Sequence, residues 1–325
     1  MNILIRTFNP YINSKTGQAL PYGSTRGTPE WLEFEEILKK CLTDLGHNLL
    51  CQKETPREED IPGDFKRIYV HKTKRDIPHG DLFYMQMHLR NLFTVDTKGW
   101  GFDHSNYPGC PGFPIEEDLE CEEWTERLSD HLLKTGVSKC QQPLETSQTP
   151  ESFILVPIQT PRDYTIRHHS PVTVKYFIDS IQAWAVETKN HVAFKMHPFN
   201  TNDHDLIEAV DYGCQSRYVH KVEGNIHELI KRSRGLFVIN SGTGFEGLIH
   251  GKPVATFGYS DYHRVTFNAD LRRLDQARNF IYSYREEDRR LAYRYVWWYI
   301  HRHGYQLSDP QMADRLRKYL EGALE

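Results

Sequence analysis

From residue 151 onward, short apolar runs alternate with segments of helical spacing, and this alternation restricts the possible fold more than any other feature. The runs that we interpret as strands are Phe153–Ile158, His191–Met196, Arg217–His220, Gly235–Asn240 and Pro253–Phe257. The segments with helical spacing are Val172–Glu187, Asp203–Val210, Asn225–Ser233 and Gly244–His250. Because short apolar strands separated by helices favour a parallel sheet with helices on both faces, this half predicts an α/β domain.

The amino-terminal half has less regular spacing. Asn2–Phe8 predicts a strand, and Pro29 begins a segment whose apolar residues follow helical spacing as far as Leu45. Three apolar runs follow, at Arg67–Val70, Asp81–Met87 and Leu92–Val95.

The length and the middle of the chain indicate how the domains are divided. A chain of 325 residues favours two domains. Residues 115–150 are first acidic and then rich in Ser, Thr, Gln and Pro, which is typical of a linker. We therefore predict a first domain over residues 1–145, a second over 151–270 and a helical tail over 271–325.

The composition excludes several classes of protein. With 44 acidic and 40 basic residues the net charge is −4, which gives no overall field that attracts nucleic acid. No uncharged apolar run approaches the ~18–20 residues of a membrane span, and the opening MNILIRTFNP lacks the apolar core of a signal peptide. The six cysteines form no CxxC pair, which excludes a zinc knuckle, and we expect reduced thiols in a cytoplasmic protein.

The most informative segment is residues 237–247, FVINSGTGFEG, in which a buried strand is followed by small residues and the start of a helix. Free N–H groups at a helix start bind phosphate, and small residues such as Gly242 and Gly244 let a ligand approach the backbone. The hydroxyls of Ser241 and Thr243 add two donors, and Glu246 could reach a ribose diol. The alternative is an ordinary tight turn with Glu246 in solvent.

Two further segments end strands of the same predicted sheet. In FKMHP, Lys195 and His197 stand at a carboxyl end and can pair with a phosphate. In VPIQTPRD, Gln159 can bond to a sugar and Asp163 can act as a base or nucleophile. Each could instead be a simple strand-ending turn, but the carboxyl ends of parallel strands lie at one edge, where ligands bind in such sheets.

The order ILVPIQ…D, FKMHP and GLFVINSGTGFEGLIHGKPVATFG, followed by a helical tail rich in Tyr and Arg, resembles the capsule polysaccharide biosynthesis family over roughly residues 150–307. That family includes bacterial Kdo transferases of capsule assembly. The resemblance implies an α/β, GT-B-like fold, in which two Rossmann-like domains face each other across a cleft. It implies that residues 1–145 bind the acceptor, that 151–270 bind a nucleotide-sugar donor, and that 271–325 brace the junction.

The resemblance also implies roles for single residues. His197 and the Ser241–Thr243 loop would hold the donor phosphate, and Glu246 would hold the ribose. Gln159 and Asp163 would face the reacting sugar. We expect Lys195 to help neutralise the departing phosphate.

The amino-terminal half offers candidates for acceptor binding. Trp100 lies between two glycines after a predicted strand and suits stacking on a sugar or base. His71 is a further candidate for acceptor binding, and Asp96, Asp103 and His104 could orient hydroxyl groups. The two aspartates are also reserve candidates for the catalytic base. The alternative is a packed aromatic loop with polar residues at its surface.

Other signatures of catalysis are weak or missing. Asp203-His204-Asp205 has the DxD pattern of metal-dependent transferases, but acids are also favoured at a helix start, so we predict no metal. The chain contains neither GxSxG nor GxxxxGK[ST], so hydrolase and kinase readings have no local support.

The sequence therefore predicts a metal-independent glycosyltransferase that uses a CMP- or UDP-linked sugar as co-substrate, needs no other cofactor and acts on a glycan. A first alternative is transfer to hydroxymethylated bases of viral DNA, with Trp100 and Arg285–Arg302 facing the polynucleotide. A second is a non-catalytic protein that binds a nucleotide sugar.

The tail carries an apolar face within Leu291–Ile300. We expect Tyr293, Val296, Trp297 and Ile300 to be buried. We expect Arg290, Arg294 and Arg302 to lie outside or to pair with the acidic segment 116–130.

Overall fold

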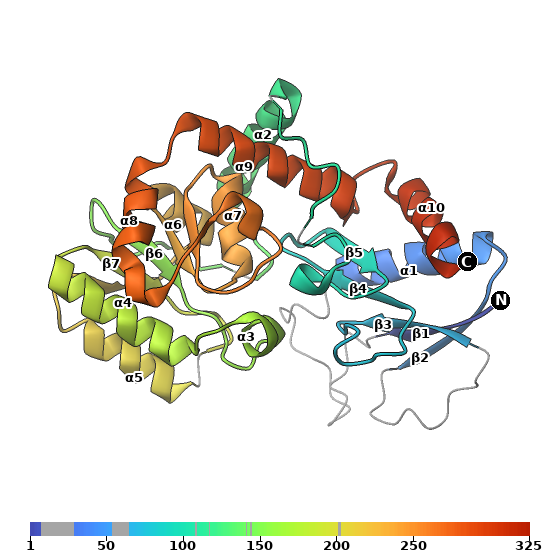
Figure 1. The fold of residues 1–325 in the computed structure, drawn as a ribbon, viewed down its shortest axis with the longest axis horizontal. Helices are drawn as coiled ribbons and strands as arrows, with labels where there is room; N and C mark the ends of the chain where they lie inside the picture. Colours follow the sequence, from blue (N-terminus) through green and yellow to red (C-terminus); the bar gives the residue numbers. More distant parts are fainter. Residues whose placement is uncertain are drawn as a thin grey trace. The chain divides into compact units, whose positions relative to one another are not determined.

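The computed structural model describes residues 1–7, 29–53, 65–107, 109–116, 118–140, 142–143, 145–200 and 203–325. Contacts within the chain divide it into two units (Figure 1). Unit 1 consists of Met1–Pro111 and Tyr299–Glu325, and unit 2 of Gly112–Trp298. Within the described ranges, no helix combines the length and the apolar character that crossing a membrane requires.

Unit 1 is built around a mixed sheet, whose described strands follow the order β12-β5-β4-β3-β1-β2. They are β1 (Asn2–Thr7), β2 (Asn48–Lys53), β3 (Phe65–Val70), β4 (Leu82–Gln86), β5 (Leu92–Asp96) and β12 (Tyr305–Gln306). The first four are parallel, whereas β5 is antiparallel to both β4 and β12. Helices α1 (Pro29–Asp44) and α10 (Met312–Leu324) share one hydrophobic core with the sheet. Two short helical turns, η1 (Gly101–Asp103) and η4 (Tyr299–His303), complete the described part of this unit.

Unit 2 contains a sheet that is parallel throughout, with its described strands in the order β8-β7-β6-β9-β10-β11. They are β6 (Ile154–Pro157), β7 (Val192–Lys195), β8 (Val219–Lys221), β9 (Gly235–Val238), β10 (Val254–Thr256) and β11 (Phe267–Asn268). Counted along the chain, this order is 3-2-1-4-5-6, that of doubly wound nucleotide-binding sheets. The direction of winding reverses between β6 and β9.

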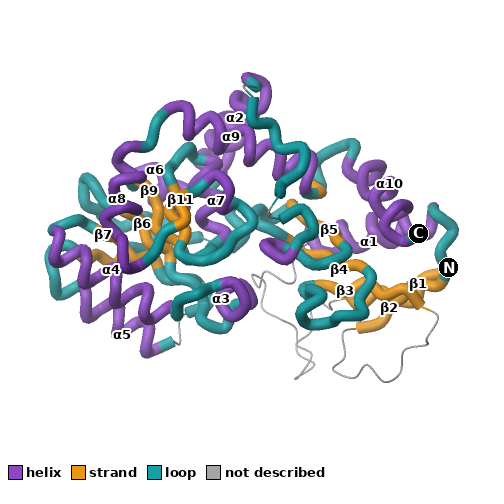
Figure 2. The backbone as a smooth tube through the Cα atoms, in the orientation of Figure 1, coloured by secondary structure: helices purple, strands orange, loops and turns teal. Residues whose placement is uncertain are grey.

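Helices cover both faces of this second sheet (Figure 2). Those of unit 2 are α2 (Leu119–Thr135), α3 (Tyr164–His169), α4 (Val174–Thr188), α5 (His204–Gly213), α6 (Ile226–Arg232), α7 (Gly242–Ile249), α8 (Leu274–Ser283) and α9 (Glu286–Trp298), with turns η2 (His263–Val265) and η3 (Leu271–Arg273). On one face, α4, α5 and α8 share a core with alternate strand residues such as Phe194 and Phe237. On the other, α7 packs so closely that a Cβ at Gly247 would lie 3.0 Å from Leu236.

The predicted alternation of strands and helices after residue 151 is confirmed, with most ends within two residues of those expected. The predicted α/β class is confirmed as well, because both units contain parallel strands with helices. The predicted strand at Asn2–Phe8 is present as β1, and Phe8 lies outside the described residues. The arrangement of two domains across a cleft stays a prediction.

The segment expected to be a linker is different in the structure, because its first part forms α2. Asp118 caps this helix by accepting a hydrogen bond from the backbone N–H of Cys121 at 3.1 Å, and Gly136 ends it with φ 65°. Contacts assign α2 to unit 2, so the division near residue 111 differs from the boundary expected at 145–151. The tail is likewise divided, with α9 in unit 2 and α10 in unit 1, and its bracing role stays a prediction.

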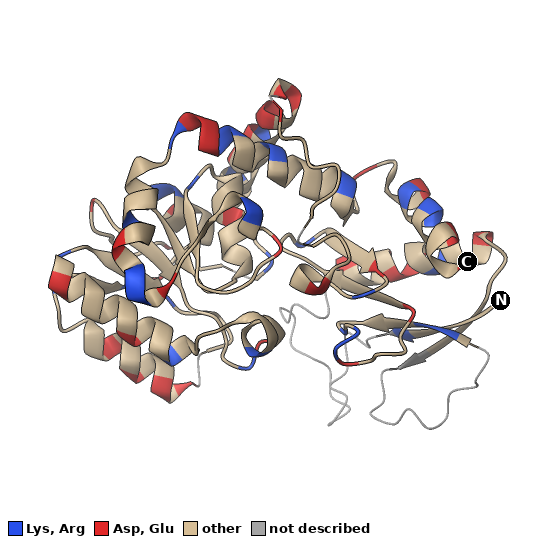
Figure 3. Ribbon diagram, in the orientation of Figure 1, with Lys and Arg blue, Asp and Glu red and all other residues tan. Residues whose placement is uncertain are grey.

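A buried ion pair joins α2 to α9. Arg294 Nη1 lies 2.6 Å from Glu122 Oε1, and both side chains are 7% exposed. Arg290 lies 3.8 Å from the other Glu122 oxygen, so the predicted pairing of these arginines with the acidic segment is confirmed. Figure 3 shows the acidic first turn of α9 followed by basic residues.

The predicted apolar face of the tail is confirmed, since Tyr293, Val296 and Ile300 are buried, whereas Trp297 is only partly buried. Arg294 is itself buried rather than outside. It follows that α2 is held to unit 2 by a desolvated charge pair, which is costly to break on one side only.

We expect Glu122→Leu to lower the free energy of unfolding by about 3–5 kcal/mol, because it leaves the Arg294 charge buried without its partner. Adding Arg294→Met should restore most of that loss, because the buried charge is then removed. Glu126→Gln is the control: Glu126 forms an exposed pair with Arg289 at 3.9 Å, worth at most ~1 kcal/mol. Urea unfolding monitored by circular dichroism measures the wild type and these three variants, and a double variant no more stable than Glu122→Leu would contradict the expected coupling.

Candidate functional site

The ends of β6 and β9 are tied together at the point where the winding of the second sheet reverses. Gln159 Nε2 donates to Asn240 Oδ1 at 2.9 Å, and the Asn240 backbone N–H donates to Gln159 Oε1 at 3.1 Å. Asn240 Nδ2 also donates to the Thr165 carbonyl at 3.0 Å, at the start of α3. Doubly wound sheets bind ligands outside the carboxyl ends of the strands at this point. Gln159, expected to face the reacting sugar, is 7% exposed and bonds to Asn240 through both amide atoms.

Asn200, which follows β7, adds an unused acceptor at the same edge. It is 2% exposed, and its Nδ2 donates to the Gln159 carbonyl at 3.2 Å. Its Oδ1 accepts no hydrogen bond from the described part of the chain. Because an unsatisfied buried acceptor is costly, a ligand that brings a donor to this edge would be stabilised there.

The small-residue turn after β9 begins α7. Ser241 Oγ caps the helix by accepting from the Thr243 N–H at 3.2 Å, and the Ser241 carbonyl accepts from the Tyr262 hydroxyl. A Cβ at Gly244 would collide with the Tyr262 ring, so this glycine is required by packing rather than by a ligand. Gly242 and Thr243 are the partly exposed residues of the turn.

Lys195 and His197 follow at the neighbouring strand end. Lys195 is 8% exposed, and burial lowers the pKa of its ammonium group, although Glu246 opposes the shift. Burial also lowers the pKa of His197, and Asp163 opposes that shift. His197 Nδ1 accepts from the Phe199 N–H at 3.1 Å, so the neutral ring carries its proton on Nε2. Both groups would be stabilised in their charged forms by an anion.

Asp163 caps α3. Its Oδ1 accepts from the Thr165 N–H at 2.9 Å and from the Thr165 hydroxyl at 2.8 Å, and the residue is exposed. Asp163 follows β6 and His197 follows β7, the neighbouring parallel strand, so both come after the same edge of the sheet. The structure thus brings together, at one edge, Gln159, Asp163, Lys195, His197 and the Ser241 turn.

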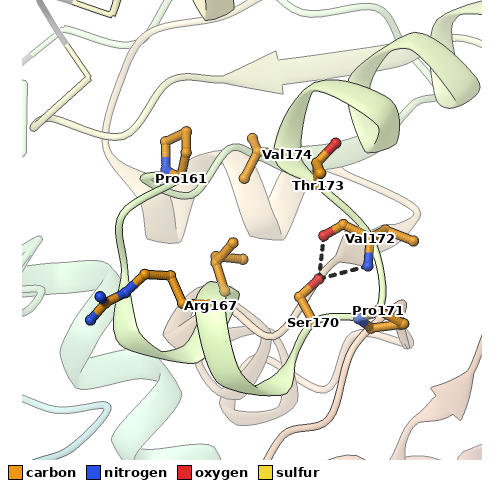
Figure 4. Close-up of a pocket in the computed structure, with 8 residues that line it drawn as sticks. Pro161, Arg167, Ser170, Pro171, Val172, Thr173 and Val174 are labelled. Atoms are coloured by element: carbon orange, nitrogen blue, oxygen red, sulfur yellow. Dashed lines mark hydrogen bonds between the residues drawn. The ribbon is translucent and has the colours of Figure 1, made fainter.

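A pocket of about 320 Å³ lies beside this edge, between α3 and the start of α4 (Figure 4). Its lining residues are Pro161, Ile166, Arg167, Ser170, Pro171, Val172, Thr173 and Val174. The Ser170 hydroxyl bonds to the backbone of Val172, and the Arg167 guanidinium extends away from the other side chains drawn. The sequence predicts here only a strand-ending turn that includes Pro161 and a helix from Val172 onward, because a short apolar loop between two helices has no distinctive signature.

Glu246 is buried rather than exposed toward solvent. It is 4% exposed, and its Oε1 accepts from the Ser138 hydroxyl at 2.6 Å and lies 4.0 Å from His227 Nε2. The alternative of a solvated acid at the helix start is therefore wrong. Ser138 belongs to the segment that was expected to be a linker, so no local pattern indicates this contact.

Next to Glu246, a chain of hydrogen bonds connects α2 to the segment that follows it. Ser129 Oγ lies 2.8 Å from His250 Nδ1, His250 Nε2 lies 2.8 Å from His227 Nδ1, and His227 Nε2 lies 2.9 Å from the Val137 carbonyl. A carbonyl can only accept, so His227 Nε2 carries a proton. With both rings neutral, His250 then donates to His227 and Ser129 donates to His250. Consistent with this, burial beside His227 lowers the pKa of His250 to about 3.

The acceptor candidates lie in unit 1, separate from the donor candidates in unit 2. Asp96 is fully buried and accepts hydrogen bonds from the backbone N–H groups of Lys98, Gly99 and Ser105. Trp100 is 7% exposed and stacks on His71 at 5.5 Å between ring centroids. Because Trp100 is buried and stacked on His71, the two rings fit the alternative of a packed aromatic loop.

The other two candidates of unit 1 also have partners within it. Asp103 Oδ1 accepts from Arg75 Nε at 2.6 Å. His104 is buried, with Nδ1 3.5 Å from Asp96 Oδ2 and 3.1 Å from the backbone N–H of Asn106. Asp96 and its neighbours therefore organise the loop after β5.

The DxD pattern occurs at a helix start, where Asp203 caps α5 by accepting from the Leu206 N–H at 3.4 Å. Across the described ranges, no group of three His, Cys, Asp or Glu residues has the arrangement of a metal site.

We expect the neutral His250 to make stability depend on pH. Its folded pKa of about 3 lies below the unfolded value of ~6.5, so the unfolded state binds more protons and stability falls as the pH drops below ~6.5. Between pH 7.5 and 5.5 this residue should cost ~1.4 kcal/mol.

Urea unfolding at the two pH values measures this cost. His250→Asn should lose about that much of the pH dependence, whereas His131→Asn, at an exposed site on α2, should keep the wild-type dependence. Equal pH dependence in His250→Asn and wild type would contradict the neutral hydrogen-bond chain.

Comparisons with known proteins concern the family and the fold of the chain. Residues 116–295, more than half of the chain, match the model of the family described as capsule polysaccharide biosynthesis protein. The chain is 24% identical to the capsule polysaccharide export protein KpsS of Escherichia coli over 192 residues, which are 55% of this chain and 49% of that protein. The match thus spans about half the length of this curated relative.

Among solved structures, the chain is similar to the β-Kdo 2,7 transferase of Thermosulfurimonas dismutans KpsC, with a TM-score of 0.53 and 14% identity. That alignment covers 100% of both chains. At this identity the likeness concerns the fold.

Proposed function

The chain belongs to the capsule polysaccharide biosynthesis protein family, and we propose that it is a glycosyltransferase whose nucleotide-sugar donor binds at the carboxyl edge of the second sheet. The observation that carries the proposal is the convergence of Asp163, Lys195, His197 and the start of α7 where the strand order reverses. An edge of this kind accommodates a nucleotide.

The donor's phosphate would be held by positive groups already at the edge. In glycosyl transfer, negative charge develops on the departing phosphate, and preoriented donors at a site poor in water stabilise it strongly. Lys195 and His197 supply cations, and the N-terminus of α7 supplies a partial positive charge. We propose a CMP- or UDP-linked donor and a reaction that needs no metal, because these groups can neutralise the departing charge.

Asp163 is our candidate for the base or nucleophile. Its carboxylate is exposed, caps α3 through Oδ1, and opposes the lowering of the His197 pKa. The reserve candidates Asp96 and Asp103 already bond to neighbouring groups of unit 1. An exposed carboxylate beside the donor site is better placed to reach an acceptor hydroxyl.

For the acceptor we propose a glycan. The names of the similar proteins concern capsule polysaccharide export and Kdo transfer, and no observation on the site favours a DNA base. The proposed acceptor region is unit 1, and a cytoplasmic location is proposed from the six cysteines, which are all free thiols.

Thermal shift with CMP, UDP, GDP and their sugar conjugates tests whether the edge binds a nucleotide. A ligand at 100 times its Kd adds ~2.7 kcal/mol of stability, which raises the melting temperature measurably. We expect a cytidine or uridine nucleotide to do so. A panel without any shift at millimolar ligand would overturn the proposed function.

Substitution of single carboxylates tests the catalytic role. We expect Asp163→Asn to lower turnover by at least ~100-fold while the nucleotide still binds, because loss of a general base costs 10²–10⁴. Asp205→Asn is the matched control, since Asp205 lies on α5, and neither it nor EDTA should change turnover. Retained activity in Asp163→Asn would remove its catalytic role, and a catalytically inert wild type that binds nucleotide would favour the non-catalytic alternative.

A further inference from the structure

We propose that Phe199, which follows β7 at the carboxyl edge of the second sheet, stacks on the base of the bound donor nucleotide. The inference rests on the proposed function, because it assumes that a nucleotide binds at this edge. It adds an aromatic surface to a site whose other candidate residues supply charge and hydrogen bonds.

The backbone around Phe199 is held at the edge by hydrogen bonds on both sides. The Phe199 N–H donates to His197 Nδ1 at 3.1 Å, and the Asn200 N–H donates to the His197 carbonyl at 2.9 Å. The Asn200 side chain is buried and donates to the carbonyl of Gln159, which follows β6. Phe199 therefore belongs to a tight turn that is attached to the end of the neighbouring strand.

The ring of Phe199 contacts the ring of His197 and is nevertheless open to solvent. The two ring centroids lie 5.1 Å apart, with an angle of 54° between the ring planes. Phe199 is 52% exposed, and of the phenylalanines whose side chains the structure describes it alone is exposed. A large apolar surface thus stays in water next to the histidine that we propose as a phosphate ligand. A ligand that covers this surface gains free energy by removing it from water.

The base is the part of a nucleotide that fits this surface. Since the Phe199 N–H occupies Nδ1 of His197, Nε2 is the ring nitrogen that remains for a phosphate. Base and phosphate are joined through a single ribose, so the base comes near the residues beside the phosphate site. Every base has a π-face that can stack on an aromatic side chain. Phe199 therefore adds affinity for cytosine and uracil alike, without selecting between them.

Exposure alone does not distinguish Phe199, because isolated apolar side chains are common at protein surfaces. Tyr212, near the end of α5, is 73% exposed. Helix α5 connects the parallel strands β7 and β8, so its last residues lie toward the amino edge of the sheet, away from the donor site. Tyr212 is therefore the matched control, an exposed aromatic ring at the opposite edge.

The test uses four variants of the full chain, Phe199→Leu, Phe199→Trp, Tyr212→Leu and Tyr212→Trp. Leucine keeps an apolar side chain against His197 but has no aromatic face, whereas tryptophan keeps one. Calorimetry measures Kd for CMP and UDP. Quenching of tryptophan fluorescence by the nucleotide reports stacking on the added indole, and melting temperatures check that each variant is folded.

We expect Phe199→Leu to weaken nucleotide binding about tenfold, the size of stacking one base on an aromatic side chain, and Phe199→Trp to bind at least as tightly as wild type. The nucleotide should quench the fluorescence of Phe199→Trp more than that of Tyr212→Trp. Both Tyr212 variants should bind like the wild type.

Two results would overturn the inference and leave the proposed function standing. One is a wild type that binds CMP or UDP while Phe199→Leu binds it equally well, because the ring then only packs against His197. The other is equal quenching in Phe199→Trp and Tyr212→Trp. If wild type binds neither nucleotide, the inference and the proposed function are both overturned.

Discussion

The exchange of two hydrogen bonds between Gln159 and Asn240 joins the carboxyl ends of β6 and β9, and the geometry of the site depends on it. These strands lead to opposite sides of the sheet, because the chain continues from β6 toward β7 and from β9 toward β10. The backbone ladder between β6 and β9 is short, since it pairs Ile154 and Leu155 of β6 with two residues of β9. The amide pair extends that connection to the residues that follow the strands. Asp163 follows Gln159 and caps α3, and Ser241 follows Asn240 and caps α7. The positions of both caps therefore depend on the same amide pair.

The buried polar groups of unit 2 differ in whether the fold provides them with hydrogen-bond or ion-pair partners. Glu122 and Arg294 neutralise each other, and the histidines His227 and His250 each have a partner at both ring nitrogens. At the sheet edge the situation is the opposite, since Lys195 and His197 are desolvated and Asn200 Oδ1 accepts no hydrogen bond from the residues that the structure describes. Buried polar groups normally find partners, so exceptions that gather at one edge indicate a ligand.

The parts of the fold that could be predicted from sequence are those encoded locally. The strands and helices after residue 151 have periodic apolar residues, and Asn225 and Thr173 are caps recognisable within three residues of the groups they bind. Helix α2 was missed because its composition is acidic, although Asp118 and Gly136 are typical start and stop signals. The edge of the second sheet could be predicted from the alternation of strands and helices, because parallel strands place their carboxyl ends together.

What the sequence could not indicate depends on contacts between distant residues. Ser138 and Glu246 are 108 positions apart, and Ser129 and His250 are 121 apart. Neither pair has a pattern that links its members, and a Ser-rich stretch after an acidic helix is typical of a linker. In unit 1, too, no local pattern indicates the contacts of Asp96, which accepts hydrogen bonds from three backbone N–H groups of the loop after it.

The electrostatics of the edge connect anion binding with proton binding. Burial lowers the pKa values of Lys195 and His197 in the free protein, so each ring or ammonium group gives up its proton more readily than in water. A phosphate placed beside them favours the protonated forms and raises both pKa values again. By linkage, binding then takes up protons, and affinity increases as the pH falls through the range where free His197 is neutral and bound His197 is charged. Desolvation makes the charged forms of Lys195 and His197 unfavourable while the edge is empty. It strengthens their attraction to a bound phosphate, because few water molecules compete with the phosphate for Lys195. A site of this kind discriminates between ligands first by their charge.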